Sequence, residues 1–213
     1  NAANVHANFN NIVSNTGTGV FGVSNGGTGT LDAENNWWGS TTGPTHTSNP
    51  GGKGDRVSDN VDFTPWLKTQ ISGGDSKTCP AGGTTTVGSS TLGVSAEVTT
   101  TTGTPKVTVA TYASNPGAVT FSAFGKYVDL LISSADGVTQ VMIKVYYTDA
   151  EIAAAGLVES LLKLYWWNGR SWVACSDTGV NTVDNFIWAR ITASTVPNLS
   201  QLIGSPFGNS WDD

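Results

Sequence analysis

The chain has 213 residues, enough for one large or two modest domains with their own hydrophobic core. Only 12% of the residues are charged and the formal net charge is −6, so no basic surface exists for nucleic acid or an anionic membrane. No apolar run approaches the roughly 18 residues that a membrane-inserted helix needs. Abundant Gly, Thr, Ser and Asn favour a β-rich extracellular protein, and a start at Asn1 without a signal peptide predicts a processed or excised piece.

The N-terminal part contains a short internal repeat. VHANFN (5–10) aligns with LDAENN (31–36) at an offset of 26 residues, with Asn10 over Asn36. A period of this length is typical of solenoids, and the intervening segments resemble strands and turns. We therefore expect a coiled parallel sheet in which asparagines stack at the corners. The side chains expected to point inward are Val5, Ala7, Leu31 and Ala33.

The segment ENNWWGSTTGP (34–44) places two tryptophans side by side. Sealing an apolar core is the preferred interpretation, and a platform for a sugar ring is the alternative. A solenoid end exposes its apolar interior and needs a cap. The expected cap consists of Trp37, Trp38, Phe63 and Trp66.

The run NNIVSNTGTGVFGVSNGGTGTLDAENNWWGSTTGP, followed by GDRVSDNVDFTPWL, resembles the last coils of right-handed parallel β-helix repeats in secreted and cell-surface proteins of bacteria and archaea. The resemblance covers roughly residues 1–70 and implies that a solenoid ends here. Its N-terminal side would then be open, with unpaired strand groups that can pair with another chain. Either upstream coils of the same polypeptide or the next copy, head to tail, would cover it. The expected contact residues are Val5, Ala7, Phe9 and Ile12.

Residues 73–91 hold many glycines and no apolar pattern, which predicts a linker between a first domain (1–72) and a second (92–213). Cys79 lies in this segment, and Cys175 is the only other cysteine. A disulfide between them would close a loop of roughly a hundred residues and contribute about 4 kcal/mol. The alternative is two unrelated buried thiols.

The second domain alternates like the strands of a half-buried antiparallel sheet, interrupted by one short helix. Thr148 followed by Glu151 is a capping box, and Gly156 is the expected helix end.

The stretch LLKLYWWNGRSWVAC (161–175) predicts a hairpin, because Asn168-Gly169 suits a two-residue turn. This turn places Trp167 opposite Arg170 and Tyr165 opposite Trp172. One face would be the core, with Leu162, Leu164, Trp166, Val173 and Cys175. The other face would carry Lys163, Tyr165, Trp167, Arg170, Trp172 and Ala174.

The second face forms an aromatic strip edged by cations. Other parts of the chain can cover it, or it can stack sugar rings or dock another subunit. Trp167 and Arg170 can also form a simple cation–π pair. The candidate contact residues are Tyr165, Trp167, Arg170 and Trp172.

The segments VTVATYASNPG, FGKYVDLLISS, VYYTDAEIAAAGLVESLLKLYWWNGRSWVACSDTGVNT and FIWARITASTVPNLSQLIGSPFG resemble a β-sandwich module at the C-terminal end of large bacterial and archaeal surface proteins. The resemblance covers about residues 105–208. It implies an extracellular or cell-surface location and a scaffold role, and it brings no catalytic residue.

Candidates for chemistry are few. The G-x-S-x-G match at residues 22–26 lacks the following helix that a nucleophile elbow needs, and His46 is expected to be solvent-exposed. The repeat stacks His6 on the outer face over Asp32, next to Glu34, which is either a thin catalytic constellation or, as we favour, a solvated ladder. Four oxygen-bearing side chains provide a possible structural calcium site without the spacing of an EF-hand. They are Asp55, Asp59, Asn60 and Asp62.

The expected fold is therefore all-β: terminal coils of a right-handed parallel β-helix, then an antiparallel, immunoglobulin-like β-sandwich with one short helix. The expected function is a non-catalytic extracellular structural or self-assembly module, such as the subunit of a filament or surface layer. The alternative is a carbohydrate-binding or polysaccharide-acting β-helix fragment. No cofactor other than the possible calcium is expected.

Overall fold

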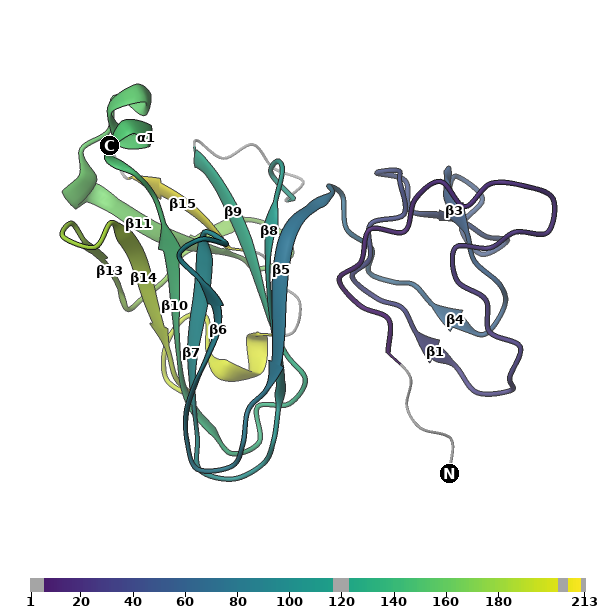
Figure 1. Cartoon of the computed structure of the whole chain (residues 1–213), viewed down its shortest axis with the longest axis horizontal. Coiled ribbons are helices and arrows are strands. Elements are labelled where there is room, and N and C mark those ends of the chain that lie inside the picture. Colours follow the sequence, from purple (N-terminus) through teal and green to yellow (C-terminus); the bar gives the residue numbers. More distant parts are fainter. Residues whose placement is uncertain (1–5, 117–122, 203–206, 212–213) are drawn as a thin grey trace. The chain divides into compact units, whose positions relative to one another are not determined.

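The computed structural model describes residues 6–116, 123–202 and 207–211. Over these residues the chain is mostly β, with a single α-helix. It divides into two compact units, Asn1–Ile71 and Ser72–Asp213, which are called unit 1 and unit 2 below (Figure 1). No helix of the described residues is long and apolar enough to span a membrane.

Unit 1 is built from very short parallel pairs. Its strands are β1 (Leu31–Asp32), β2 (Pro44–Thr45), β3 (Gly54–Arg56) and β4 (Val61–Asp62). β1 pairs with β4 and β2 pairs with β3, both in parallel. Isolated parallel bridges join His6 to Asp32 and Asn11 to Trp37, which is the 26-residue offset of the sequence repeat. The long ladders of a parallel β-helix are not seen in the described part of unit 1. Left-handed backbone occurs at Asn35, three residues after β1, and at Asn60, directly before β4, with φ of 55° and 57°.

Stacked asparagines and one tryptophan hold unit 1 together. The Asn36 Oδ1 accepts hydrogen bonds from the Asn10 backbone N–H at 2.8 Å and from the Asn10 Nδ2 at 3.0 Å, as the repeat predicts. The Asn36 Nδ2 donates to the Ala33 carbonyl at 2.7 Å. Trp38 has no exposed surface and lies in the core of the unit. That core consists of Ala33, Trp38, Val57, Val61 and Phe63, with Ile12, Val23, Leu31 and Trp66 packed against it.

Unit 2 contains two sheets. The five-stranded sheet has the order β13-β14-β10-β7-β6, and the six-stranded sheet has the order β12-β11-β15-β9-β8-β5. The first contains β6 (Gly83–Ser89), β7 (Val94–Thr100), β10 (Val138–Tyr146), β13 (Thr178–Asn181) and β14 (Phe186–Ile191). The second contains β5 (Ile71–Thr78), β8 (Lys106–Tyr112), β9 (Ala123–Ile132), β11 (Leu162–Trp167), β12 (Trp172–Ala174) and β15 (Phe207–Trp211). Alternate apolar side chains of both sheets form one shared core, as period-2 strands require.

The helical segments of unit 2 are short. They are α1 (Asp149–Ala155) and the 3-10 turns η1 (Glu159–Leu161) and η2 (Leu199–Gln201). The capping box predicted for α1 is confirmed, because Thr148 accepts from the Glu151 N–H while the Glu151 side chain accepts from the Thr148 N–H. Gly156 ends the helix in the left-handed conformation, with φ of 66°.

Residues 73–91, predicted to be a linker, instead form most of β5 and β6, so that prediction is wrong. Each of these strands is the outer strand of its own sheet. Side chains of β5 form hydrogen bonds with the backbone of β6. The Asp75 Oδ2 accepts from the Gly88 N–H at 2.8 Å, and the Lys77 Nζ donates to the Thr86 carbonyl at 2.8 Å. The Gly88 N–H is the main cause of the lowered pKa of Asp75. The absence of an apolar pattern here reflects two sheet edges, where most side chains are exposed and only Val87 of β6 enters the core.

The predicted disulfide is not formed, because both cysteines are free, buried thiols. Cys79 follows β5 at one edge of the six-stranded sheet, and Cys175 follows β12 at the other edge. Five strand spacings of about 4.8 Å separate these edges by about 24 Å. A disulfide needs Cα atoms within about 7 Å. The alternative of two unrelated thiols therefore describes the structure.

Candidate functional site

The hairpin between β11 and β12 differs from the predicted one. Trp167 pairs with Trp172 and Tyr165 with Ala174, so residues 168–171 form a four-residue loop rather than a two-residue turn. The Asn168 side chain accepts hydrogen bonds from the backbone N–H groups of Arg170 and Ser171, both at 2.9 Å. This side-chain turn competes with the tight turn that Asn-Gly favours and adds two residues to the loop.

The shift of register by two residues leaves the two faces of the hairpin unchanged. Side chains alternate with period two along a strand, so an even shift keeps every residue on its predicted side. Leu162, Leu164 and Trp166 are buried in the core, as expected. Trp167 and Trp172 lie half-exposed on the opposite face.

This opposite face carries a cluster of rings, called the aromatic face below. It consists of Tyr127, Tyr165, Trp167 and Trp172. The Trp167 and Trp172 ring centroids are 5.5 Å apart with planes inclined by 57°. The Tyr127 and Trp172 centroids are 6.0 Å apart with planes inclined by 43°. These spacings fall in the range of favourable aromatic pairs.

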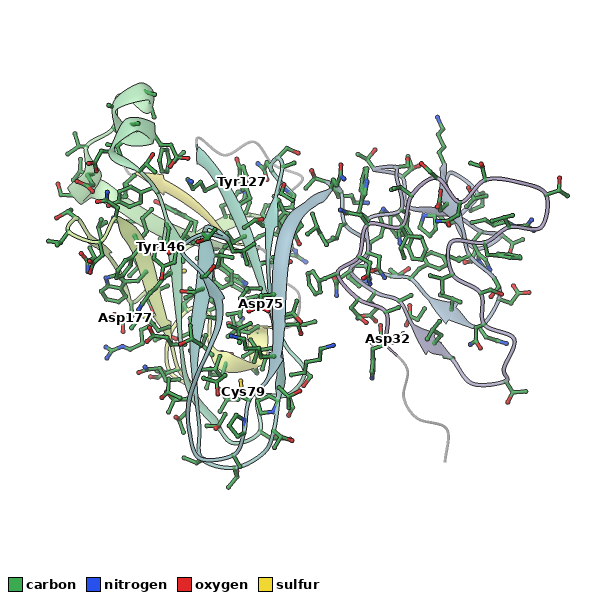
Figure 2. All side chains as sticks on the ribbon, in the orientation of Figure 1. Asp32, Asp75, Cys79, Tyr127, Tyr146 and Asp177 are labelled. Atoms are coloured by element: carbon green, nitrogen blue, oxygen red, sulfur yellow. The ribbon has the colours of Figure 1, made fainter. Side chains whose placement is uncertain are left out.

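Sheet register explains how residues from three strands meet there. Gly208 of β15 is the direct partner of both Tyr165 in β11 and Tyr127 in β9. Direct partners in an antiparallel pair share a face, so both tyrosines stand on the same side, with a glycine between them. Tyr127, labelled in Figure 2, is nearly buried, and this burial raises the pKa of its hydroxyl. No local pattern in the sequence indicates that Tyr127 belongs to this face, because β9 and β11 become neighbours only through β15.

The predicted pair of Arg170 with Trp167 is not formed. Arg170 lies exposed in the four-residue loop, and Trp167 packs on Trp172 instead. The aromatic face is therefore a set of mutually packed, partly exposed rings without a cation of the loop stacked on it.

In unit 1, His46 is only 14% exposed at its side chain, so the prediction of a solvent-exposed histidine is wrong. Its Nδ1 lies 2.7 Å from the Ser48 Oγ, and its Nε2 lies 3.2 Å from the Asp59 Oδ1. Its ring packs edge-on against Phe63, with centroids 5.4 Å apart. His46 borders a surface groove of about 530 Å³ that also contains Phe21.

The outer ladder of unit 1 is present. The His6 Nδ1 is 2.7 Å from the Asp32 Oδ2, and the Asn8 Nδ2 donates to the Asp32 Oδ1 at 3.0 Å. Partial burial opposes ionisation of Asp32, but the hydrogen bonds from His6, the Glu34 N–H and Asn8 outweigh it and lower its pKa. Burial and the charges of Asp32 and Asp62 raise the pKa of Glu34. His6 is 57% exposed at its side chain, which agrees with the favoured solvated ladder.

The four oxygen-bearing residues of the possible calcium site have separate partners. Asp55 accepts from Asn15, and Asp59 pairs with His46. Asn60 donates to the Gly27 carbonyl at 3.2 Å, and Asp62 accepts from the Thr64 N–H at 3.2 Å. Over the described ranges, no three His, Cys, Asp or Glu side chains come together as metal ligands.

The expected cap and the expected solenoid-end contacts are only partly buried. Trp38 and Phe63 are buried, whereas Trp37 and Trp66 are half-exposed. Trp66 packs over Gly43 and donates to the Thr41 carbonyl at 3.2 Å.

At the N-terminal side, Val5 lies outside the described residues. Ala7, Phe9 and Ile12 are half-buried, and their backbone N–H groups donate to the segment 32–37. Their use as contacts to another chain remains a prediction.

Comparison with known proteins finds no matching family model, no curated protein and no solved structure similar to this chain.

Proposed function

We propose that the chain is a non-catalytic extracellular binding module that holds a carbohydrate on the aromatic face of unit 2. The observation that carries this proposal is the set of adjoining, half-exposed rings of Trp167 and Trp172 beside Tyr127. The apolar C–H face of a pyranose ring stacks on such rings, while its hydroxyls stay in water. Because the ring planes are inclined by 43° and 57°, the face suits a twisted glycan chain better than a flat one.

The proposed architecture supports an extracellular role. In this proposal the two sheets of unit 2 are an immunoglobulin-like β-sandwich of a surface protein. Unit 1 is the last part of a parallel solenoid, which Trp38 closes. Supporting observations are the core shared by the two sheets, the 26-residue parallel pairings of unit 1 and the low content of charged residues.

A glycan array with the purified chain, followed by calorimetry on the sugars that bind, tests the proposal. We expect Trp172→Ala and Trp167→Ala each to weaken binding by about fivefold or more, since stacking on an aromatic ring contributes on the order of 1 kcal/mol or more. Trp188→Ala is the matched control, because Trp188 is a half-exposed tryptophan on the other sheet, packed over Gly179. Absence of glycan binding, or equal losses in all three variants, would contradict the proposal.

A second candidate function is self-association through the N-terminal segment of unit 1. The observation in its favour is that Ala7, Phe9 and Ile12 stay half-exposed although they already pair with the segment 32–37. An additional strand or coil, from an upstream segment or from the next copy head to tail, would cover them. Light scattering and electron microscopy of the chain, with and without residues 1–12, test this. A monomer at high concentration would exclude assembly into a filament or surface layer.

A further inference from the structure

Unit 1 contains a groove that the proposed glycan site does not use. Its volume is about 530 Å³, within the range of about 300–1,000 Å³ that small-molecule sites occupy. The lining residues include Phe21, Thr45, His46, Arg56, Val57 and Asp59. One aromatic ring, one guanidinium, one imidazole and one carboxylate thus meet in a single depression.

Neighbouring parallel segments place these groups side by side. Thr45 of β2 is the register partner of Arg56 in β3, and Val57 bridges to Val23 on the other side. The Gly22 N–H donates to the Arg56 carbonyl at 2.8 Å, which fixes the segment that carries Phe21 next to β3. The groove is therefore built on backbone hydrogen bonds.

Arg56 is oriented by the ring beside it. Its Cζ lies 4.8 Å from the centroid of the Phe21 ring, within the range of a cation–π contact. Arg56 is exposed and forms no ion pair with an acid anywhere in the described ranges. Its neighbour Asp55 is already engaged, because the Asp55 Oδ2 accepts from Asn15 at 2.6 Å. The exposed Arg56 guanidinium therefore has N–H groups available to a ligand, and two of them can bind both oxygens of a carboxylate.

The groove lining also offers an acceptor, Asp59. Asp59 is 91% exposed at its side chain, and only its Oδ1 is near the His46 Nε2. The contacts of His46 with Ser48 and Phe63 hold this imidazole in place. A ligand that fits both groups needs an anionic acceptor for Arg56 and hydroxyl donors for Asp59.

We infer that this groove binds a carboxylated sugar, a uronic acid residue of an acidic glycan. The sugar carboxylate accepts two parallel hydrogen bonds from the Arg56 guanidinium, and a ring hydroxyl donates to the Asp59 carboxylate. Arg56 supplies a local positive charge for an anionic ligand on a protein whose net charge is −6. All residues of this site belong to unit 1, and the inference is independent of the glycan site proposed on the aromatic face of unit 2.

Calorimetry with the whole chain tests the inference. The probes are hexasaccharides of glucuronate, galacturonate and mannuronate, each compared with its counterpart in which the carboxylates are reduced to neutral alcohols. We expect at least one acidic probe to bind about tenfold to a hundredfold more tightly than its neutral counterpart, as for one charge-assisted bidentate contact. Arg56→Gln should remove this preference. Arg56→Lys should keep only part of it, because a lysine cannot form the two parallel hydrogen bonds.

Trp172→Ala separates this site from the aromatic face. It should leave the preference for the carboxylate unchanged, even if it weakens the binding of neutral glycans. Each variant is checked for an unchanged thermal transition, which an exposed arginine should not shift. Equal affinity for acidic and reduced probes, no binding of any acidic probe, or an unchanged preference in Arg56→Gln would each overturn the inference.

Discussion

Asp129 is a carboxyl group inside the core of unit 2, and its replacement by asparagine gives the most quantitative test of the structure. Its side chain lies on β9 and is 1% exposed. The Tyr112 hydroxyl donates to its Oδ2 at 2.6 Å, and the Leu130 N–H donates to its Oδ1 at 2.7 Å. Burial opposes the charged form more strongly than these hydrogen bonds favour it, and the pKa of Asp129 rises from 3.8 to about 6.

The magnitude follows from this shift. Between about pH 4 and pH 6 the folded state holds the Asp129 proton more tightly than the unfolded chain, so the free energy of unfolding falls as pH rises. A difference of about 2.2 between the two pKa values corresponds to about 3 kcal/mol, which is fully lost above about pH 6. An asparagine side chain at this position would resemble the neutral acid at every pH. We therefore expect the difference in free energy of unfolding, Asp129→Asn minus wild type, to increase by about 3 kcal/mol between pH 4 and pH 7.

The two cysteines provide an assay for unit 2 alone. Cys79 and Cys175 are the only cysteines of the chain, and both are buried in unit 2. A pulse of 4,4′-dithiodipyridine, which reacts with thiols in mild acid, reports their exposure at each urea concentration. Urea titrations at several pH values then give the free energy of unfolding of both proteins. Other ionisable groups contribute equally to both proteins and cancel in the difference.

The slope of this difference against pH decides the outcome. If the free energies of unfolding of Asp129→Asn and the wild type differ by a constant amount from pH 4 to pH 7, whether positive or negative, the raised pKa of Asp129 is refuted. Tyr112→Phe gives a second check, because it removes the hydroxyl that stabilises the carboxylate. We expect the free energy of unfolding of Tyr112→Phe to fall more steeply with pH than that of the wild type.

Three further predictions concern packing, sheet edges and thiols. Trp38→Ala should lower the free energy of unfolding of unit 1 by about 3–5 kcal/mol, whereas Trp37→Ala, at a partly buried position, should cost clearly less, both measured by hydrogen exchange of the unit 1 backbone amides. Asp75→Ala should free the Gly88 backbone N–H of β6 and increase self-association, measured by light scattering, and a chain that stays monomeric would contradict this role of Asp75. Both thiols, Cys79 and Cys175, should react only after unfolding, and a reducing agent should leave the thermal transition unchanged, whereas a shift would indicate a disulfide.

Much of the local structure could be predicted from the sequence, because its signals involve residues close in the chain or one repeat apart. The capping box of Thr148 and Glu151 needs only one helical turn. The stacking of Asn10 on Asn36 follows from the 26-residue offset. The faces of the hairpin, with Trp166 inward and Trp167 outward, follow from the period of a strand.

The candidate sites were predicted only in part. Trp167 and Trp172 were placed on one face of the hairpin but opposite other partners, and Tyr127 joins them through β15, which no local pattern indicates. The groove in unit 1 was not predicted at all. Its Phe21 and Arg56 lie 35 residues apart in the sequence and meet through backbone pairing of short segments that have no regular repeat.

The sequence by itself determined the β-rich class, the short helix with its caps, the stacking repeat of unit 1 and the inward and outward faces of β11. These depend on the period of a strand, on short-range hydrogen bonds and on composition, all of which act locally. Only the tertiary structure decided the four-residue loop at Asn168, the strands in the predicted linker and the separation of Cys79 from Cys175. The reason is physical: a strand gains its hydrogen bonds from partners far away in the chain, so register and strand order are set by the packing of the whole sheet.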